Sequence, residues 1–270
     1  MYRLNAWVSV PQWAMAIALA ALVGACGGNK ETSSTGGETP AAAPGGEKVD
    51  KATAGNVSGT VSLDGTAPKN DAIKMNADPV CLREAKGPQL QETYMAEDGK
   101  LANVFVYVKD GLGNYAYDPP SEPARIDQKE CRYHPHVFGM RVNQTLEIIN
   151  SDPTLHNIHA LPKSNQEFNT GQPIQGMKTT HTFTAKEVMV PFKCDVHGWM
   201  NAYVGVLDHP YFAVTDKSGK FELKDVPPGT YTIEAWHERF GTQEQKVTLG
   251  AKESKEVTFT FKAAGATTTN

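Results

Sequence analysis

A thiol, an imidazole and a thioether lie within one short segment of the chain, Cys194-Asp-Val-His197-Gly-Trp-Met200. These three side chains are ligands that soft metal ions prefer. Each residue has a simpler explanation: Cys194 could be half of a disulfide, and Met200 could be a packing residue. The combination at this spacing is much rarer by chance than any one of them. The segment therefore predicts a metal site.

A second imidazole must come from another part of the chain. The segment TLEIIN (145–150) reads as a strand, and Leu155-His156-Asn157-Ile158-His159 follows it. Two imidazoles and one thiolate in a trigonal plane, with a weak axial thioether, form a type 1 copper site. Soft sulfur favours Cu(I), and imidazole serves both oxidation states. Such a site exchanges one electron with little rearrangement.

Spacing over residues 125–207 resembles the cupredoxins, the blue copper proteins. The matching residues run from Tyr133 and Pro135 through Asn150-x-Asp152 to His156-Asn157, and then from Phe192 to Met200. The short ligand loop looks most like that of amicyanin. The resemblance implies that one type 1 copper ion is bound by His156, Cys194, His197 and Met200.

The same resemblance assigns roles to residues beside the ligands. It implies that Asn157 hydrogen-bonds between the two ligand segments. Val196 departs from the family, where many members have Pro, and leaves a backbone N–H that could donate to the thiolate. Electrons would leave through an exposed edge of His197, with Leu155, Val196 and Trp199 as an apolar docking patch. His159 is expected beside the ligands or at the surface.

The other cysteines are expected to lie in an oxidising compartment, where a leftover thiol needs a reason such as metal ligation. With Cys26 assigned to a lipid, Cys81, Cys131 and Cys194 remain, an odd number. If Cys194 binds metal, Cys81 and Cys131 are free to form a disulfide; in the alternative, Cys194 pairs with one of them. Cys131, His134 and His136 could also form a second metal site, although alternating strand histidines explain that pattern more simply.

The N-terminal segments do not belong to the fold. Residues 13–23 are an apolar run too short to span a bilayer and typical of a signal peptide core. Val23-Gly24-Ala25-Cys26 resembles a bacterial lipobox, which implies a signal peptide over 1–25 and lipidation of Cys26; an ordinary secretory signal is the alternative. Gly27 favours the outer membrane. We expect a lipid-anchored protein of the bacterial cell envelope, facing the periplasm or the surface.

Composition separates linkers from folded chain. Residues 26–52 have almost no apolar side chains and predict a disordered linker, and 263–270 predict a disordered tail. Short alternating segments separated by turn dipeptides such as Asp64-Gly65 and Asp110-Gly111 predict an all-β chain of sandwiches or barrels. One short helix is conceivable around 78–86.

A second module follows the ligand loop. Thr215-Asp216, Gly219, Phe221, Val226-Pro227-Pro228-Gly229 and Tyr231 resemble the carboxypeptidase regulatory-like module, a transthyretin-like β-sandwich. The expected start of that module is missing before residue 211 but present at Ser58–Val61 and 101–106. We therefore predict one sandwich from 55–124 and 208–262, with a cupredoxin Greek-key sandwich (125–207) inserted; sequential domains are the alternative.

The leading hypothesis is a lipid-anchored electron carrier rather than an enzyme, with a c-type cytochrome or an oxidase as partner. A copper chaperone or storage protein is one alternative, and a non-catalytic binding module, with carbohydrate as an example of its ligand, is another. Without Arg3 the chain has 25 basic and 30 acidic residues and no basic run of four or more. That composition argues against nucleic acid as a partner.

Overall fold

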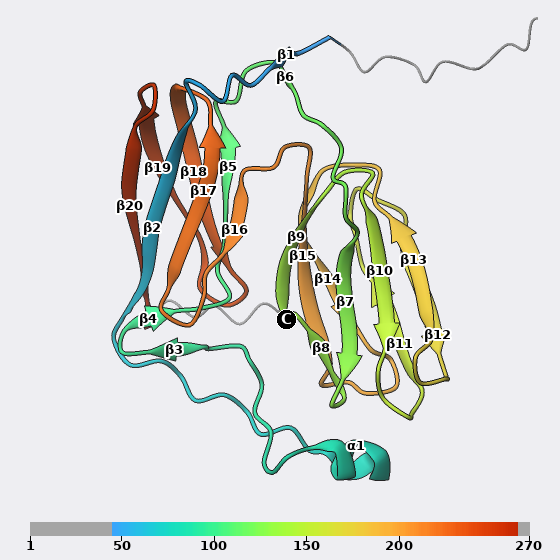
Figure 1. Ribbon diagram of the computed structural model, residues 1–270. Coiled ribbons are helices and arrows are strands. Elements are labelled where there is room, and N and C mark those ends of the chain that lie inside the picture. The colour runs from blue at the N-terminus through green and yellow to red at the C-terminus, as the bar shows by residue number, and fades with distance from the viewer. Residues whose placement is uncertain (1–44, 264–270) are drawn as a thin grey trace, which may run out of the picture. The chain divides into compact units, whose positions relative to one another are not determined.

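The computed structural model describes residues 45–263 (Figure 1). The predicted signal peptide, Cys26, and the tail from residue 264 lie outside the described residues. The chain is all-β, as predicted, with one short α-helix, α1 (Pro79–Glu84), and one 3₁₀ turn, η1 (Met75–Ala77). Among the described residues, no helix is long and apolar enough to cross a membrane.

The first sandwich is built from two separated stretches of chain. One sheet has the order β16-β5-β18-β19, and the other β17-β2-β4-β3, with β20 pairing in parallel with β2. The bounds in the first sheet are β16 Phe212–Val214, β5 Phe105–Asp110, β18 Gly229–His237 and β19 Gly241–Leu249. In the second they are β17 Lys220–Val226, β2 Gly55–Asp64, β4 Lys100–Leu101, β3 Ala96–Glu97 and β20 Ser254–Lys262.

The second sandwich is built from the intervening chain. Its sheets have the orders β13-β10-β7-β8 and β12-β11-β14-β15-β9. The bounds in the smaller sheet are β13 Lys178–Thr182, β10 Thr145–Asn150, β7 Ala124–Lys129 and β8 Arg132–His134. In the larger they are β12 Phe168–Gln172, β11 His156–Ala160, β14 Glu187–Lys193, β15 Asn201–Leu207 and β9 Val137–Arg141.

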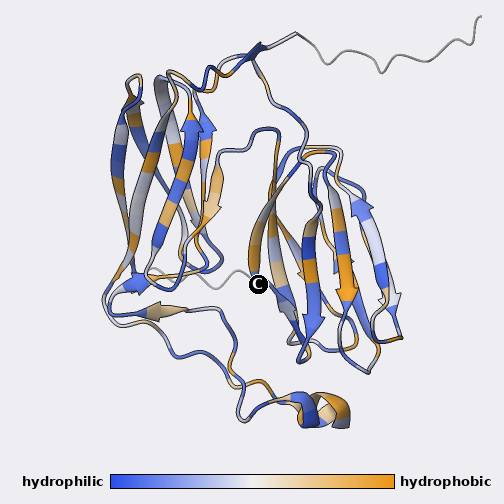
Figure 2. Ribbon diagram, in the orientation of Figure 1, coloured by the Kyte–Doolittle hydropathy of each residue, from blue (hydrophilic) through white to orange (hydrophobic). Residues whose placement is uncertain are grey.

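Each pair of sheets encloses its own apolar core. In β2 the side chains of Val57, Val61 and Leu63 are buried and alternate with half-buried polar ones, the period-2 pattern of a strand with one core face. Figure 2 shows the same banding along the strands of both sandwiches. A smaller cluster, which includes Phe105 and Leu207, joins residues of the two sandwiches.

Residues 66–95, which we call the strap, connect β2 to β3 and carry η1 and α1 (Figure 1). Pro79 opens α1, and the Asp78 side chain accepts a hydrogen bond from the Val80 backbone N–H at 2.7 Å, an N-cap. The only long-range strand contact within the strap is an isolated bridge between Ala72 and Leu90. Backbone hydrogen bonds beside this bridge and from the Ala102 N–H to the Met95 carbonyl add to it, and side chains supply the other contacts.

The folded chain starts earlier than the predicted linker allows. Within the expected linker, β1 (Glu47–Lys48) pairs in parallel with β6 (Tyr115–Ala116). Lys48 also contacts Asp118 at 3.1 Å, an exposed ion pair. Backbone pairing, which composition does not report, accounts for the difference.

Candidate metal centre

The segment from Cys194 to Met200 is the connection between two neighbouring antiparallel strands. Its flanking residues Lys193 and Asn201 are direct cross-strand partners in β14 and β15. The Cys194 N–H donates to the Met200 carbonyl at 3.1 Å, and the Met200 N–H donates to the His197 carbonyl at 2.9 Å. The loop is thereby folded on itself, with all three chemically interesting side chains at most 2% exposed.

His156, the first residue of β11, meets this loop. Its Nδ1 lies 2.9 Å from Nδ1 of His197, and the two ring centroids are 4.7 Å apart. The Cys194 Sγ lies 3.8 Å from the same Nδ1 of His197. One ligand atom from each of the three residues lies within 4.8 Å of the others, and all three side chains are buried. The structure thus brings together two imidazoles and one thiol from separate segments.

A carboxylate holds the far nitrogen of each imidazole. Asp152 Oδ2 lies 2.8 Å from Nε2 of His156, and Asp78 Oδ2 lies 3.0 Å from Nε2 of His197. Burial raises the pKa of Asp78, but its hydrogen bonds, first that from His197, outweigh burial and lower the pKa to about 2. The pKa of Asp152 is lowered in the same way, against burial, by His156 and two backbone N–H groups. Both acids are therefore ionised at neutral pH.

Ionised carboxylates accept hydrogen bonds and cannot donate them, so each Nε2 carries its proton. Nδ1 of each ring, the nitrogen turned away from its carboxylate, then faces the other ring and is the atom available to a metal ion. Burial lowers the pKa of His156, but Asp152 and Cys194 raise it further, and the net shift is upward. The site therefore attracts positive charge.

The thiol is also prepared for ligation. Burial raises the pKa of Cys194, but hydrogen bonds from His156 and His197 outweigh it and lower the pKa to about 6. The His197 backbone N–H donates to Sγ at 3.3 Å, and Asn157 lies 3.2 Å from Sγ through Oδ1. Since thiolate is the metal-binding form, the site is poised for a cation at neutral pH.

These donors fit copper. Two converging imidazole lone pairs and a thiolate, with a methionine on the same loop, form the donor set that suits a mononuclear type 1 ion. The two other groupings of metal-binding side chains among residues 45–263 each include a disulfide sulfur, from Cys81 or Cys131, which is not a thiolate.

Residues around the ligands form a bracing network. The Asn157 Oδ1 accepts from the Asp195 N–H at 2.8 Å and so links β11 to the ligand loop. His159, beside it, contacts Asp195 at 2.9 Å and Glu167 at 2.7 Å. Neither nitrogen of His159 is free to bind the same ion, which is consistent with a place beside the ligands.

The disulfide between Cys81 and Cys131 is present, with a Cα–Cα distance of 5.5 Å, and Cys194 is the free cysteine among the described residues. A second metal site at Cys131, His134 and His136 is therefore wrong. The Cys131 sulfur is already bonded, and Nε2 of His136 lies 2.5 Å from Glu238 of the first sandwich.

The exposed edge of His197 is absent, and that expectation is wrong. His197 is 2% exposed because the strap covers it, with Asp78 on Nε2 and the Cys81 sulfur 3.5 Å from the same atom. Of the expected patch, Leu155 and Val196 are exposed, whereas Trp199 is half-buried and donates its indole N–H to the Cys131 carbonyl at 2.9 Å.

Asp78 is the residue that sequence reasoning missed. It lies 119 positions before His197, in a segment whose only signal was a short helix. A weak indication existed, since Asp78-Pro79 is a helix-start pattern three residues before Cys81, a half-cystine. Nothing in it indicated what the carboxylate would contact.

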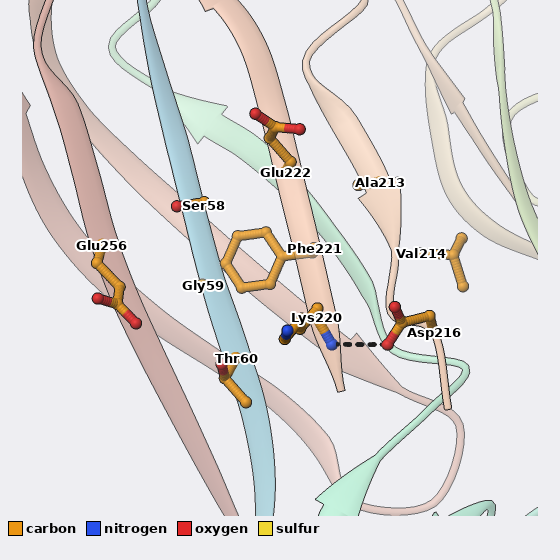
Figure 3. Close-up of a pocket in the computed structure, with 10 residues that line it drawn as sticks. All are labelled: Ser58, Gly59, Thr60, Ala213, Val214, Asp216, Lys220, Phe221, Glu222 and Glu256. Atoms are coloured by element: carbon orange, nitrogen blue, oxygen red, sulfur yellow. Dashed lines mark hydrogen bonds between the residues drawn. The ribbon is translucent and has the colours of Figure 1, made fainter. Parts of the chain in front are cut away.

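A surface pocket lies in the first sandwich, away from these ligands. It has a volume of about 510 Å³ and lies beside β2, β16 and β17 (Figure 3). Phe221 is its only aromatic ring and is 5% exposed; it packs so close to Gly59 that a Cβ there would lie 2.7 Å from the ring. The pocket therefore offers no aromatic platform for a sugar.

Comparisons with known proteins agree with this architecture. Residues 200–262 match the family model of the carboxypeptidase regulatory-like domain. No curated protein matches the chain.

Solved structures similar to the chain include a Cu-containing nitrite reductase (NirK) from Thermus scotoductus SA-01, with 21% identity, TM-score 0.30, and coverage of 35% of this chain but only 24% of that one. A purple cupredoxin from Nitrosopumilus maritimus has 22% identity and TM-score 0.27, covering 31% and 98%. A Cu(I) amicyanin mutant has 18% identity and TM-score 0.28, covering 38% and 98%. Similarity this low supports no inference about function.

Proposed function

We propose that this protein carries single electrons at a mononuclear copper site formed by His156, Cys194, His197 and Met200. The observation that carries the proposal is the convergence of two Nδ1 atoms, 2.9 Å apart, beside a low-pKa thiolate. Copper, when bound there, supplies a one-electron couple. Two imidazoles, a thiolate and a thioether leave no position for a substrate, which argues against catalysis at the metal.

The chain's own residues keep the ligands in place during electron exchange. The Asp195 N–H and the His197 N–H fix Asn157 and Cys194, and the two carboxylates fix the imidazole rings. A rigid ligand set reduces the rearrangement between oxidation states. The covered His197 implies that a partner contacts the strap or its neighbours rather than the imidazole itself.

The alternatives receive less support. A chaperone must release its ion, and His197 lies beneath a strap that a disulfide secures. Carbohydrate binding at the pocket of Figure 3 lacks an exposed ring, because the single aromatic side chain there is buried.

We further propose that the protein is a lipoprotein of the bacterial envelope, anchored through Cys26 and exchanging electrons with a c-type cytochrome or an oxidase. The lipobox-like residues before Cys26 support the anchor. Cys26→Ser should move the protein from the membrane fraction to the soluble envelope fraction. Retention of the variant in the membrane would contradict the anchor.

A visible spectrum tests the copper site. Metal-free protein given one equivalent of Cu(II) should develop the intense thiolate-to-copper absorption near the red end of the spectrum. Cys194→Ser should abolish the band, and His159→Gln, a neighbouring histidine outside the proposed ligand set, should keep it. A wild-type protein without the band, or an unchanged band in Cys194→Ser, would overturn the proposal.

A further inference from the structure

The strap belongs to the chain of the first sandwich but lies against the ligand loop of the second. Its Asp78 is 3.0 Å from Nε2 of His197. His156 has its carboxylate, Asp152, only four positions away, within the second sandwich. The two imidazoles thus have equivalent partners from different modules.

Several contacts fix the strap at this place. Cys81 is bonded to Cys131, and both sulfurs are fully buried in the core of the second sandwich, together with Met75. Gln91 donates to the Trp199 carbonyl at 3.2 Å. Arg132 contacts Gln89 and Glu92 of the strap, at 3.3 Å and 3.5 Å. The strap is therefore a docked element, secured by the disulfide and by contacts on both sides of it.

The carboxylate of Asp78 has one orientation open to it. Oδ1 accepts from the Val80 N–H at 2.7 Å, and Oδ2 accepts from the Thr154 hydroxyl at 2.9 Å as well as from His197. The proton it accepts from His197 must be on Nε2, which leaves Nδ1 of that ring as the nitrogen available to a metal ion. A partner on the far nitrogen of a ligand histidine fixes both its tautomer and its ring orientation.

We propose that the metal site is completed by both modules: Asp78 is the positioning residue that keeps His197 in the ligand tautomer, and the strap closes the site over that ring. The inference deepens the proposed function and rests on it for the identity of the metal. The claim about Asp78 and His197 can be tested without any metal.

Asp78→Asn reverses the polarity at Nε2. The Val80 N–H needs an acceptor, so the amide oxygen stays on that side and the amide NH₂ faces His197. The ring then accepts at Nε2 and carries its proton on Nδ1. Nitrogen chemical shifts of the metal-free protein should report Nε2–H for His197 in the wild type and Nδ1–H in the variant. His156, held by Asp152, should not change.

Copper affinity gives the second reading of the same variant. Loss of such a partner commonly lowers metal affinity about 10- to 100-fold, and we expect a decrease in this range for Cu(II). Asp216→Asn is the matched control, because Asp216 also accepts hydrogen bonds from a backbone N–H and a hydroxyl in a turn, but in the first sandwich. An unchanged His197 tautomer in Asp78→Asn would overturn the inference even if the protein binds copper.

The double variant Cys81→Ser/Cys131→Ser tests the covering role. Without the bond, the strap can lift from His197, so transfer of copper to a strong chelator should become at least tenfold faster. An unchanged rate would overturn the covering role. A wild type that binds no copper would instead defeat the proposed function, and the tautomer measurement would still decide the role of Asp78.

Discussion

Four of the five buried histidines in the two sandwiches form two pairs, and the environments of these pairs differ. In the second sandwich, Nε2 of His156 and Nε2 of His197 each lie beside a carboxylate, and their Nδ1 atoms face each other at 2.9 Å. In the first, Nδ1 of His237 accepts from the backbone N–H groups of Arg239 and Phe240, and Nδ1 of His209 accepts from that of Tyr211. Burial alone therefore does not make a histidine a ligand. The groups that contact its two ring nitrogens decide whether one nitrogen can bind a metal ion.

The same contrast explains the direction of the pKa shifts. Burial lowers the pKa of His209 and of His237 to about 4, and their nearby acids do not offset it. For His156, Asp152 and Cys194 overcome burial and raise the pKa. His209 and His237 of the first sandwich are thus kept neutral, whereas the surroundings of His156 in the second sandwich favour positive charge.

The largest expected effect comes from exchanging one histidine of each kind. His156→Gln should abolish the thiolate-to-copper band, because a ligand is lost. His237→Gln should keep the band at full intensity, because its Nδ1 serves the backbone only. The measurement is Cu(II) titration followed by visible absorption. Equal loss of the band in both variants would erase the distinction drawn above.

An intermediate effect is expected from the two carboxylates in metal-free protein. Asp152 is 3% exposed and also accepts from the Glu130 and Cys131 N–H groups, so Asp152→Asn should lower the free energy of unfolding by about 3 kcal/mol. Asp78→Asn should cost about 1 kcal/mol, because its side chain is 19% exposed.

Urea unfolding of both variants beside the wild type provides the comparison. If Asp78→Asn were the more damaging, the strap would be a main support of the fold rather than an addition to the site.

A smaller effect depends on pH. Between pH 6.5 and 4 the unfolded chain protonates His209 and His237 while the folded chain does not, because both folded-state pKa values are about 4. The stability contributed by these two histidines should therefore fall as pH falls below 6.5, by roughly 2 kcal/mol for each at pH 5. Above pH 6.5 neither contributes.

His237→Gln should remove about half of the pH-dependent loss of stability that His209 and His237 cause together. Urea midpoints of the metal-free protein at pH 7 and pH 5 measure it. A variant whose stability declines as steeply as that of the wild type would show that His237 is not held neutral.

Much of the site could be read from the sequence because its signals are local. Cys194, His197 and Met200 share one loop, and Asp152 and His156 follow one strand, β10, whose predicted bounds equal the observed ones. The pairing of Cys81 with Cys131 also followed once Cys194 was set aside. The all-β class followed from alternation and turn dipeptides, which need no knowledge of the partner strands.

Other features were hidden because their cause is remote or their side chains are polar. Strands such as β12 and β19 give little sequence signal, since FNTGQ and GTQEQKVTL carry few apolar residues. The cover over His197 joins residues more than a hundred positions apart. Trp199 was expected at the surface, but Cys131 and the strap contact it and leave it half-buried. These contacts also come from remote parts of the chain.

The disulfide between residues 81 and 131 also determines how much of the chain must accompany this site if it is moved into another protein. A gene fragment cut at the ends of the second sandwich, from β7 to β15, would encode every proposed ligand. It would lack Cys81 and Asp78, and so would leave Cys131 unpaired and one imidazole uncovered. Transplanting the proposed copper centre into another scaffold therefore requires a stretch of the first sandwich's chain as well.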